Sequence, residues 1–283
     1  MQNQDILVLE NLRFNPGEEQ NNPDFAHQIS ELGDIFVEEG FGVIHRAHAS
    51  TVGISKYLPS YAGFLVEQEV YNLSQIRDEA PEPFALVMGG AKIETKIPLI
   101  KAFLEKAQYI LLGGVVGQTL LYAKGETPYL HRKLLDQIPL SEAILELDHQ
   151  HKMVLPLDFW VEQEDQTFCN KVPGDLLEQD RVVDIGIATS ELFQSKIQAS
   201  ASIFWNGPMG IVEEDYGQKG TIAICESLKN HSGIRVIGGG DTAENVWNLG
   251  FKTEDFSYIS TGGGASLEFL AHAEMPGLKV LEA

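Results

Sequence analysis

Two lysines and one aspartate of this chain follow glycine-rich turns, in positions that suit phosphate chemistry. Lys92 and Lys96 come just after the sequence GGA, and Asp241 follows three glycines and precedes Thr242. Residues four apart share a helix face, so we expect both ammonium groups on one side of a helix that begins here. A carboxylate beside a phosphate requires a cation between them, and Mg²⁺ bound by carboxylates and nucleotide oxygens would supply it. Two surface lysines and a helix-capping aspartate are the alternative interpretations.

Five glycine-rich turns follow apolar runs, and they indicate the elements that position these residues. Each run predicts a buried strand that breaks at glycine and then enters a helix. Glycine lets a backbone approach a ligand closely, and a helix N-terminus offers free N–H groups to phosphate. Several such turns in series predict one parallel sheet with its ligand site along a single edge. The turns occupy residues 84–92, 109–117, 202–210, 235–242 and 258–266.

The composition predicts a globular protein of two domains. The 283 residues can form a large core, and 43% of them are hydrophobic. No apolar run is long enough for a transmembrane helix, and residues 1–14 lack the features of a signal peptide. Cys169 and Cys225 make no disulfide framework or metal spacing. We therefore expect a cytoplasmic protein with two reduced thiols.

The net charge of −21 excludes two classes of partner. Nucleic acids and anionic membranes are themselves negative and would be repelled. We interpret most acidic residues as a solvated surface. A phosphate ligand would have to be held by local lysines, arginines and backbone N–H groups against this overall charge.

Hydrophobic periodicity extends the prediction along the chain. Strands are expected at residues 6–9 and 35–37, and helices at residues 23–33, with Asn22 as the cap, and 62–78. The acidic, proline-containing segment 79–83 is the best linker candidate. Beyond it, alternating strands, turns and helices continue to about residue 270 and predict an α/β fold, a doubly wound parallel sheet.

The motifs ENLRF, FGxxHRAHAST, GGAKxxxK, WNGPMG, GGGDTA and STGGGASLEFL occur in the order found in phosphoglycerate kinase, and the chain resembles that family over nearly its whole length. The resemblance implies reversible phosphoryl transfer from 1,3-bisphosphoglycerate to ADP with Mg²⁺, giving 3-phosphoglycerate and ATP. It also implies two Rossmann-like domains joined by a helix. Residues 1–61 would be a partial phosphoglycerate-binding domain, 62–80 the interdomain helix and linker, 81–275 the nucleotide-binding domain and 276–283 a C-terminal tail.

Members of that family are longer at the N-terminus by about a hundred residues, so we expect a fragment with impaired activity on its own. A non-catalytic, nucleotide-binding remnant of the family is the alternative. A dinucleotide-dependent oxidoreductase is a third hypothesis. It is disfavoured because the chain lacks the GxGxxG fingerprint with a following acidic residue. We expect a monomer.

The resemblance assigns roles to residues of these motifs. The expected catalytic residues are Lys92, Lys96, Gly262, Gly263 and Gly264. The expected nucleotide-binding residues are Gly90, Ala91, Lys96, Gly113, Gly114, Asn206, Glu213, Gly239, Gly240, Asp241 and Thr242, with Asp241 also holding the metal. Within the second set, Glu213 would bind the ribose hydroxyls, and the glycines at 90, 113 and 114 would flank the adenine.

The substrate-side candidates are Arg13 and Arg46, because the arginine fork binds phosphate or carboxylate with two hydrogen bonds. Arg46 lies between His45 and His48, which we interpret as structural hydrogen-bonding residues. The chain also departs from the family pattern around the adenine. Val115 and Val182 stand where glycines are common, so the fit of the base is expected to differ.

Overall fold

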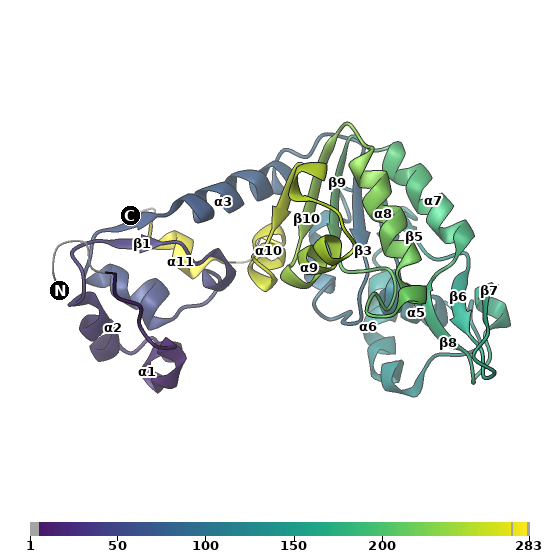
Figure 1. Cartoon of the computed structure of the whole chain (residues 1–283), viewed down its shortest axis with the longest axis horizontal. Coiled ribbons are helices and arrows are strands. Elements are labelled where there is room, and N and C mark those ends of the chain that lie inside the picture. Colours follow the sequence, from purple (N-terminus) through teal and green to yellow (C-terminus); the bar gives the residue numbers. More distant parts are fainter. Residues whose placement is uncertain (1–5, 273, 282–283) are drawn as a thin grey trace. The chain divides into compact units, whose positions relative to one another are not determined.

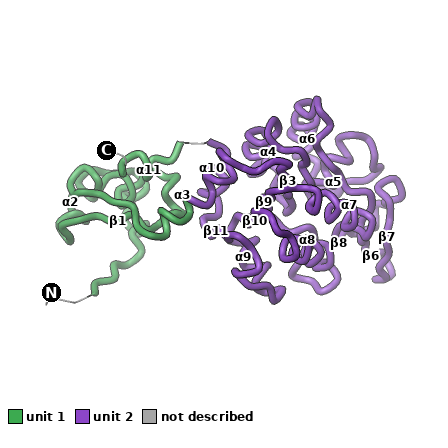
Figure 2. Tube along the Cα trace, turned by 90° about the horizontal axis from the view of Figure 1, so that it is seen from above, with its two compact units in different colours: residues 1–70, 274–283 green, residues 71–273 purple. Residues whose placement is uncertain are grey.

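The computed structural model describes residues 6–272 and 274–281, which divide into two compact units (Figure 2). Unit 1 consists of Met1–Val70 and Glu274–Ala283, and unit 2 of Tyr71–Ala273. The C-terminal segment therefore belongs with the N-terminal residues. No helix in the described residues has the length and apolar character needed to cross a membrane.

A six-stranded parallel sheet forms the centre of unit 2 (Figure 1). Its strand order is β11-β10-β9-β3-β4-β5, so the chain first winds outward from β3 in one direction and later returns beside β3 with β9. The strands are buried runs rich in branched and aromatic residues, as expected for a sheet that is covered on both faces. They are β3 (Phe84–Met88), β4 (Tyr109–Leu112), β5 (Met153–Val154), β9 (Ser202–Asn206), β10 (Ile234–Gly238) and β11 (Tyr258–Ser260).

Helices cover both faces of this sheet, which confirms the predicted doubly wound α/β fold. Val87 of β3 belongs to a core cluster with Phe193 of α7 and Ile224 of α8. The ring of Phe84, which points to the opposite face of β3, lies 5.1 Å from that of Phe103 in α4. The helices of unit 2 are α4 (Ile97–Phe103), α5 (Gly114–Ala123), α6 (Ile138–Leu145), α7 (Ile187–Gln198), α8 (Lys219–Lys229), α9 (Gly240–Asn248) and α10 (Gly264–Leu270).

A small antiparallel sheet interrupts the expected alternation of strands and helices. It consists of β6 (Phe159–Glu162), β7 (Phe168–Lys171) and β8 (Arg181–Ile185), in the order β7-β6-β8. Phe159 and Val161 point inward and form a satellite core. Side chains of β6 alternate between buried and half-buried positions, which is the pattern of a strand with one exposed face. A purely parallel sheet was predicted from the sequence, and this alternation was not taken into account.

Unit 1 contains a two-stranded parallel sheet of β1 (Phe36–Glu38) and β2 (Ser60–Ala62). Its helices are α1 (Pro16–Glu19), α2 (Pro23–Ser30) and α11 (Pro276–Lys279), and the long helix α3 (Phe64–Arg77) begins in unit 1 and ends in unit 2. The predicted cap of α2 is confirmed, since Asn22 accepts hydrogen bonds from the N–H groups of Asp24 and Phe25. α11 is joined to unit 1 by a hydrogen bond from the Gly277 N–H to the Ile44 carbonyl (2.9 Å).

Two local predictions were wrong. Residues 6–9 form no strand, and Ile6 and Val8 are 91% and 85% exposed, because no strand in the described part of the chain pairs with them. Helices also do not directly follow two of the glycine turns. α4 begins only at Ile97 and α8 only at Lys219, so irregular segments of functional interest separate each from its strand.

Candidate functional site

The candidate site of unit 2 lies where the winding of the sheet reverses. β3 and β9 are neighbours in the sheet, but the connections that leave them run in opposite directions. A crevice forms outside the carboxyl ends of the strands at such a point, and ligands of open α/β sheets bind there. The two strand ends are joined beyond the sheet by hydrogen bonds from the Gly89 N–H to the Asn206 carbonyl (3.0 Å) and from the Gly90 N–H to the Pro208 carbonyl (2.8 Å).

Lys96 reaches this point from the turn that precedes α4. It is only 8% exposed, and its ammonium group donates a hydrogen bond to the side-chain oxygen of Asn206. Burial lowers the pKa of Lys96 to about 8, although the nearby carboxylate of Asp241 opposes this shift. At neutral pH, Lys96 is therefore protonated in most of the molecules.

The prediction that Lys92 and Lys96 share a helical face was wrong. Both residues precede α4, in a turn closed by the bond from the Lys96 N–H to the Ile93 carbonyl (2.9 Å). Pro98 at the second position of α4 suits a helix start there, because proline lacks the N–H that a helix interior requires. As a result Lys96 is buried, whereas Lys92 is exposed.

Asn206 links Lys96 to the turn after β10. Its side-chain amide donates to the Gly238 carbonyl (2.6 Å), and Thr242 Oγ1 accepts a hydrogen bond from the Gly207 N–H (2.9 Å). Gly239 has φ of 103°, and a Cβ atom there would lie 2.5 Å from the Asn206 side-chain nitrogen. Only glycine combines this backbone conformation with this close approach. The structure thus brings Lys96, Asn206, Gly239 and Thr242 into one network.

Asp241 stands in the first turn of α9, directly after Gly240. The cap position of α9 is Gly239, and no side-chain hydrogen bond caps the helix. The capping interpretation of Asp241 therefore has no support in the structure. Its exposed carboxylate lies near Lys96 and at the positive end of a nine-residue helix.

The residues that would surround a base line an apolar cavity of about 220 Å³ beside this network. Gly90, Ala91, Gly114 and Glu213 were predicted and line it. Gly113 packs behind it, since a Cβ atom there would lie 2.5 Å from the sulfur of Met209. The lining residues that were not predicted as site residues are Val115, Gln118, Phe159, Val182, Val183, Asp184, Ile185, Pro208, Met209, Gly210 and Ile211.

Val115 and Val182 come together in this cavity from α5 and β8, although 67 positions separate them in the sequence. Both are the departures from the family pattern noted above. Their side chains occupy space that glycines would leave open. Both valines thus narrow the cavity that Ala91 and Glu213 also line.

The fifth glycine turn, after β11, lies at the start of α10. The Gly262 N–H donates to Ser260 Oγ (3.3 Å), and Ser260 Oγ is also hydrogen bonded to Ser266 Oγ (2.6 Å). Cβ atoms built on Gly263 and Gly264 would meet no atom within 4 Å. The two later glycines thus present an open backbone surface, while Gly262 is engaged within the turn.

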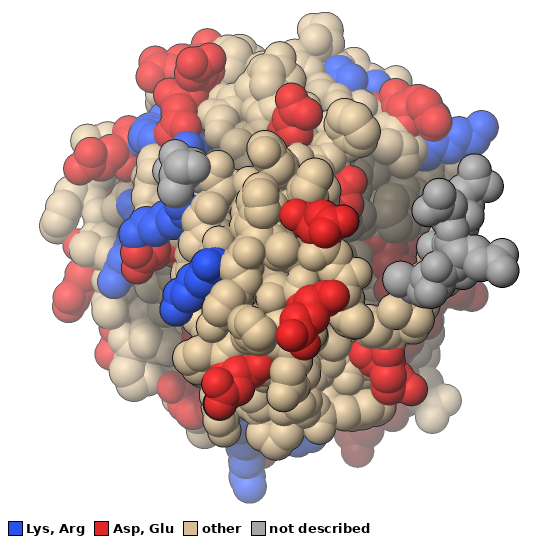
Figure 3. Space-filling model, turned by 90° about the vertical axis from the view of Figure 1, so that its left-hand side faces the viewer, with Lys and Arg blue, Asp and Glu red and all other residues tan. Residues whose placement is uncertain are grey.

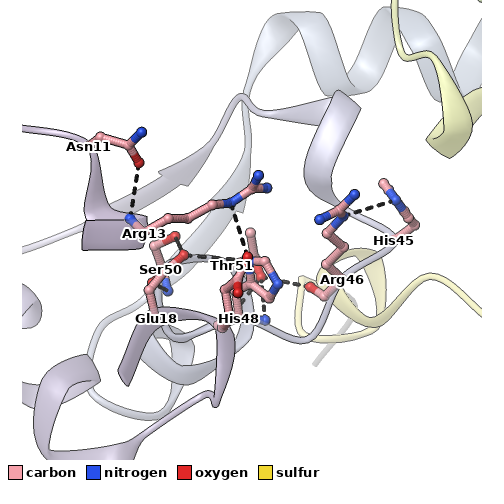
Figure 4. Close-up of polar contacts among 9 residues, drawn as sticks. Asn11, Arg13, Glu18, His45, Arg46, His48, Ser50 and Thr51 are labelled. Carbon is pink, nitrogen blue, oxygen red and sulfur yellow. Dashed lines mark hydrogen bonds and ion pairs between the residues drawn. The ribbon is translucent and has the colours of Figure 1, made fainter. Parts of the chain in front are cut away.

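The arginine candidates belong to unit 1 and lie at a separate polar cluster (Figure 4). The Arg13 backbone N–H donates to Asn11 Oδ1 (3.0 Å), and its guanidinium group lies 3.8 Å from Glu19. The Arg46 Nε–H donates to His45 Nε2 (3.3 Å). Both arginines are exposed, so their remaining N–H groups can reach an anion.

A buried glutamate fixes the segment that carries Arg46. Glu18 is 3% exposed and accepts hydrogen bonds from the Ser50 N–H (3.0 Å) and hydroxyl (2.5 Å), and its carboxylate lies 3.7 Å from His48 Nδ1. Thr51 Oγ1 accepts from the His48 N–H (3.1 Å) and donates to the Arg46 carbonyl (2.8 Å). The structural interpretation of His48 fits these contacts, which Figure 4 draws.

The acidic residues do not gather at one place on the face of the molecule in Figure 3 but lie dispersed among uncharged side chains. Among the described residues, no group of three or more His, Cys, Asp or Glu side chains forms a metal-binding cluster. A cation at Asp241 would therefore take most of its ligands from a bound phosphate compound and from water.

Comparisons with known proteins agree with this arrangement. The family model for phosphoglycerate kinase matches residues 1–272. A phosphoglycerate kinase of Streptomyces coelicolor is 39% identical over 291 residues, which cover 98% of this chain and 72% of the relative, and one of Pseudothermotoga lettingae is 40% identical over 283 residues, 97% and 70%. The crystal structure of phosphoglycerate kinase from Pyrococcus horikoshii has a TM-score of 0.85 at 30% identity. The structure of phosphoglycerate kinase from Coxiella burnetii has a TM-score of 0.86 at 32% identity. Each of the two matches covers 96% of this chain and 71% of the chain in the solved structure. The chain belongs to the phosphoglycerate kinase family.

Proposed function

We propose that this chain carries out the reaction of its family, the reversible transfer of a phosphoryl group from 1,3-bisphosphoglycerate to ADP. The observation that carries the proposal is the buried Lys96, held by Asn206 at the carboxyl ends of β3 and β9 and close to Asp241. Phosphoryl transfer requires alignment and charge neutralisation rather than covalent help from the protein. A protonated lysine with little water around it neutralises a phosphoryl group more strongly than an exposed lysine.

The base of the nucleotide would enter the apolar cavity between Ala91 and Gly114, with Glu213 accepting hydrogen bonds from the ribose hydroxyls. The α- and β-phosphates would lie at the N-terminus of α9, where Gly239, Gly240 and the Thr242 hydroxyl surround the turn. A helix N-terminus binds anions through its free N–H groups and its partial positive charge.

Asp241 is the residue that would hold Mg²⁺ together with nucleotide oxygens. When bound, the ion would neutralise phosphate charge and orient the phosphate chain. Asp241 fits this role because its carboxylate is exposed, makes no capping hydrogen bond and lies near Lys96.

We propose Lys96 and the backbone N–H groups of Gly263 and Gly264 as the donors to the transferring phosphoryl group. The N–H of Gly262 is the weaker candidate, since it already donates to Ser260 Oγ. Lys92, which is exposed, would add a longer-range positive charge. On the phosphoglycerate side, Arg13 and Arg46 would each bind a phosphate or carboxylate with the two N–H groups of the guanidinium fork.

The test measures Mg-ATP binding by calorimetry and phosphoglycerate-dependent ATP consumption in a coupled assay. Lys96→Met is expected to reduce both, and Lys92→Met, an exposed lysine four residues away, is the matched control with the smaller expected effect. Equal losses in both variants would contradict the role of Lys96. Binding of Mg-ATP with weak phosphoglycerate-dependent turnover would match the impaired activity expected above, whereas binding with no measurable turnover would favour a non-catalytic nucleotide-binding protein instead.

A further inference from the structure

The segment from Gly210 to Gly220 connects the end of β9 to the start of α8 and carries Glu213. It belongs to no sheet, and before α8 begins at Lys219 its one regular element is a short 3₁₀ turn, Asp215–Gly217. Even so, it contributes to the wall of the apolar cavity through Gly210, Ile211 and Glu213. Hydrogen bonds within the segment, such as the one from the Gly217 N–H to the Glu214 carbonyl (2.8 Å), shape its turns, and contacts from outside fix it against the cavity.

β8 supplies these contacts. The Ile211 N–H donates to the carbonyl of Val183 (2.8 Å), which fixes the backbone two residues before Glu213. Further contacts come from the side chains of Arg181 and Asp184 in the same strand. β8 belongs to the small antiparallel sheet that the sequence did not predict.

Asp184 is buried at 2% exposure and joins both ends of the segment. Its carboxylate accepts hydrogen bonds from the Gly220 N–H (2.7 Å) and the Ile185 N–H (2.8 Å). Cβ atoms built on Gly210 and Gly220 would lie 2.5 and 2.4 Å from this carboxyl group. Asp184 therefore fills the space between two glycines, and its carboxylate accepts hydrogen bonds there that the amide nitrogen of asparagine could not accept.

Arg181 holds the middle of the segment. Its guanidinium group donates to both carboxylate oxygens of Glu214 (3.1 and 2.8 Å) and to the Tyr216 hydroxyl (3.2 Å). It also donates to Glu162 of β6 (2.6 Å), and the Tyr216 ring packs 4.3 Å from the Phe168 ring. An isolated surface ion pair would stabilise little, but a two-pronged arginine–carboxylate pair within a network fixes direction as well as distance.

We propose that Arg181 and Asp184 are positioning residues that hold the Glu213 carboxylate at the cavity for the ribose hydroxyls of a nucleotide. Glu213 directly precedes Glu214, the partner of Arg181, and follows Ile211 by two residues, so its backbone is fixed on both sides. The inference rests on the proposed function, because it assumes that Glu213 binds ribose. It adds two residues that act through the segment carrying Glu213, Asp184 from the cavity wall and Arg181 from outside the cavity.

The experiment compares the dissociation constants of Mg-ATP and of Mg-2′,3′-dideoxy-ATP, which lacks the ribose hydroxyls. The wild-type chain should prefer Mg-ATP by about 3- to 10-fold, the worth of one net hydrogen bond. Glu213→Gln, Arg181→Met and Asp184→Asn should each reduce this preference. Because Arg181 acts through Glu213, the double variant R181M/E213Q should show no further loss beyond E213Q.

Two matched controls separate positioning from general damage. Asp180→Asn alters another buried aspartate of this region, which pairs with Lys171 (2.7 Å), and Arg132→Met breaks an exposed pair with Glu178 (3.7 Å). Both controls should keep the wild-type preference for Mg-ATP. Loss of the preference in the controls as well would overturn the inference.

Hydrogen exchange of the ligand-free chain gives a readout that does not depend on nucleotide. Asp184→Asn should speed exchange at Gly220, and Arg181→Met should speed it between residues 211 and 217. Unchanged exchange together with an unchanged preference in both variants would overturn the inference alone. A wild-type chain that binds neither nucleotide would overturn the proposed function, and the role inferred for Glu213 with it.

Discussion

Replacing the buried lysine of the candidate site should stabilise the fold while it removes most of the nucleotide binding. Lys96 is 8% exposed and hydrogen bonded to Asn206. In Lys96→Met the apolar stem keeps its packing, but the ammonium group no longer has to be taken out of water. A buried charge that is kept for ligand binding lowers the free energy of unfolding of the ligand-free protein.

The size of this destabilisation follows from the pKa of Lys96, which burial lowers from 10.5 to about 8. Each pKa unit corresponds to about 1.4 kcal/mol, so the buried charge costs about 3 kcal/mol at pH 7. Between pH 8 and pH 10.5 the unfolded wild-type chain binds more protons than the folded one, so this cost disappears as the pH rises. The advantage of the Met variant should therefore shrink by about 2 kcal/mol between pH 7 and pH 9.5.

Urea unfolding of the wild-type chain, Lys96→Met and Lys92→Met at the two pH values measures this change. The curve of Lys92→Met should follow that of the wild type, since the lysine it removes is exposed. Calorimetry should show that only Lys96→Met loses most Mg-ATP binding. A difference between Lys96→Met and the wild type that stays constant with pH, or grows as the pH rises, would refute the reasoning.

Three further outcomes are expected. Asp241→Asn should weaken binding of Mg-ATP far more than binding of metal-free ATP in calorimetry, and equal losses would count against a metal role. Burial raises the pKa of Asp184 from 3.8 to about 7. The folded chain then binds more protons than the unfolded chain between these values, so this carboxyl removes stability as the pH rises. The unfolding free energy of Asp184→Asn relative to the wild type should thus increase by about 2–3 kcal/mol from pH 5 to pH 7.5, and a decrease in urea titrations would contradict the cause given. Gly239→Ala should lower the free energy of unfolding by about 1–3 kcal/mol, because the alanine is strained at this positive φ and its Cβ meets Asn206. The loss should be smaller in the control Gly125→Ala, where φ is also positive but no atom lies within 4 Å of the added Cβ. Equal losses in urea unfolding would show that the contact with Asn206 contributes nothing.

The parallel sheet could be predicted because its strands carry a strong local signal. Each of the five apolar runs ends at glycines, and all five form strands of one sheet. The helix at residues 62–78 was also predicted, and α3 occupies Phe64–Arg77. Such runs are short but largely buried on both faces, so their apolar pattern is continuous and easy to recognise.

The position of Lys96 could be predicted only in part. Its place after a glycine turn pointed to phosphate chemistry, but its burial depends on Asn206, which lies 110 residues away. Val115 and Val182 were placed around the base from the sequence, and both line the cavity, but Asp184 and most of the other lining residues were missed, because they meet only in the folded chain. Strand residues 6–9 were overpredicted, because an apolar run forms a strand only where a neighbouring strand pairs with it.

The dispersed acidic surface seen in Figure 3 has a consequence for the rate at which a nucleotide arrives. With a net charge of −21, the chain repels an anionic Mg-nucleotide over distances of about one Debye length, ~8 Å at physiological salt. A protein whose binding cleft is positively charged attracts an anion by long-range steering, and added salt slows that association. Here added salt should speed the encounter, while the bound lifetime is set by the short-range donors at Lys96 and α9. The affinity of this chain for the nucleotide would then come from slow dissociation rather than from fast association.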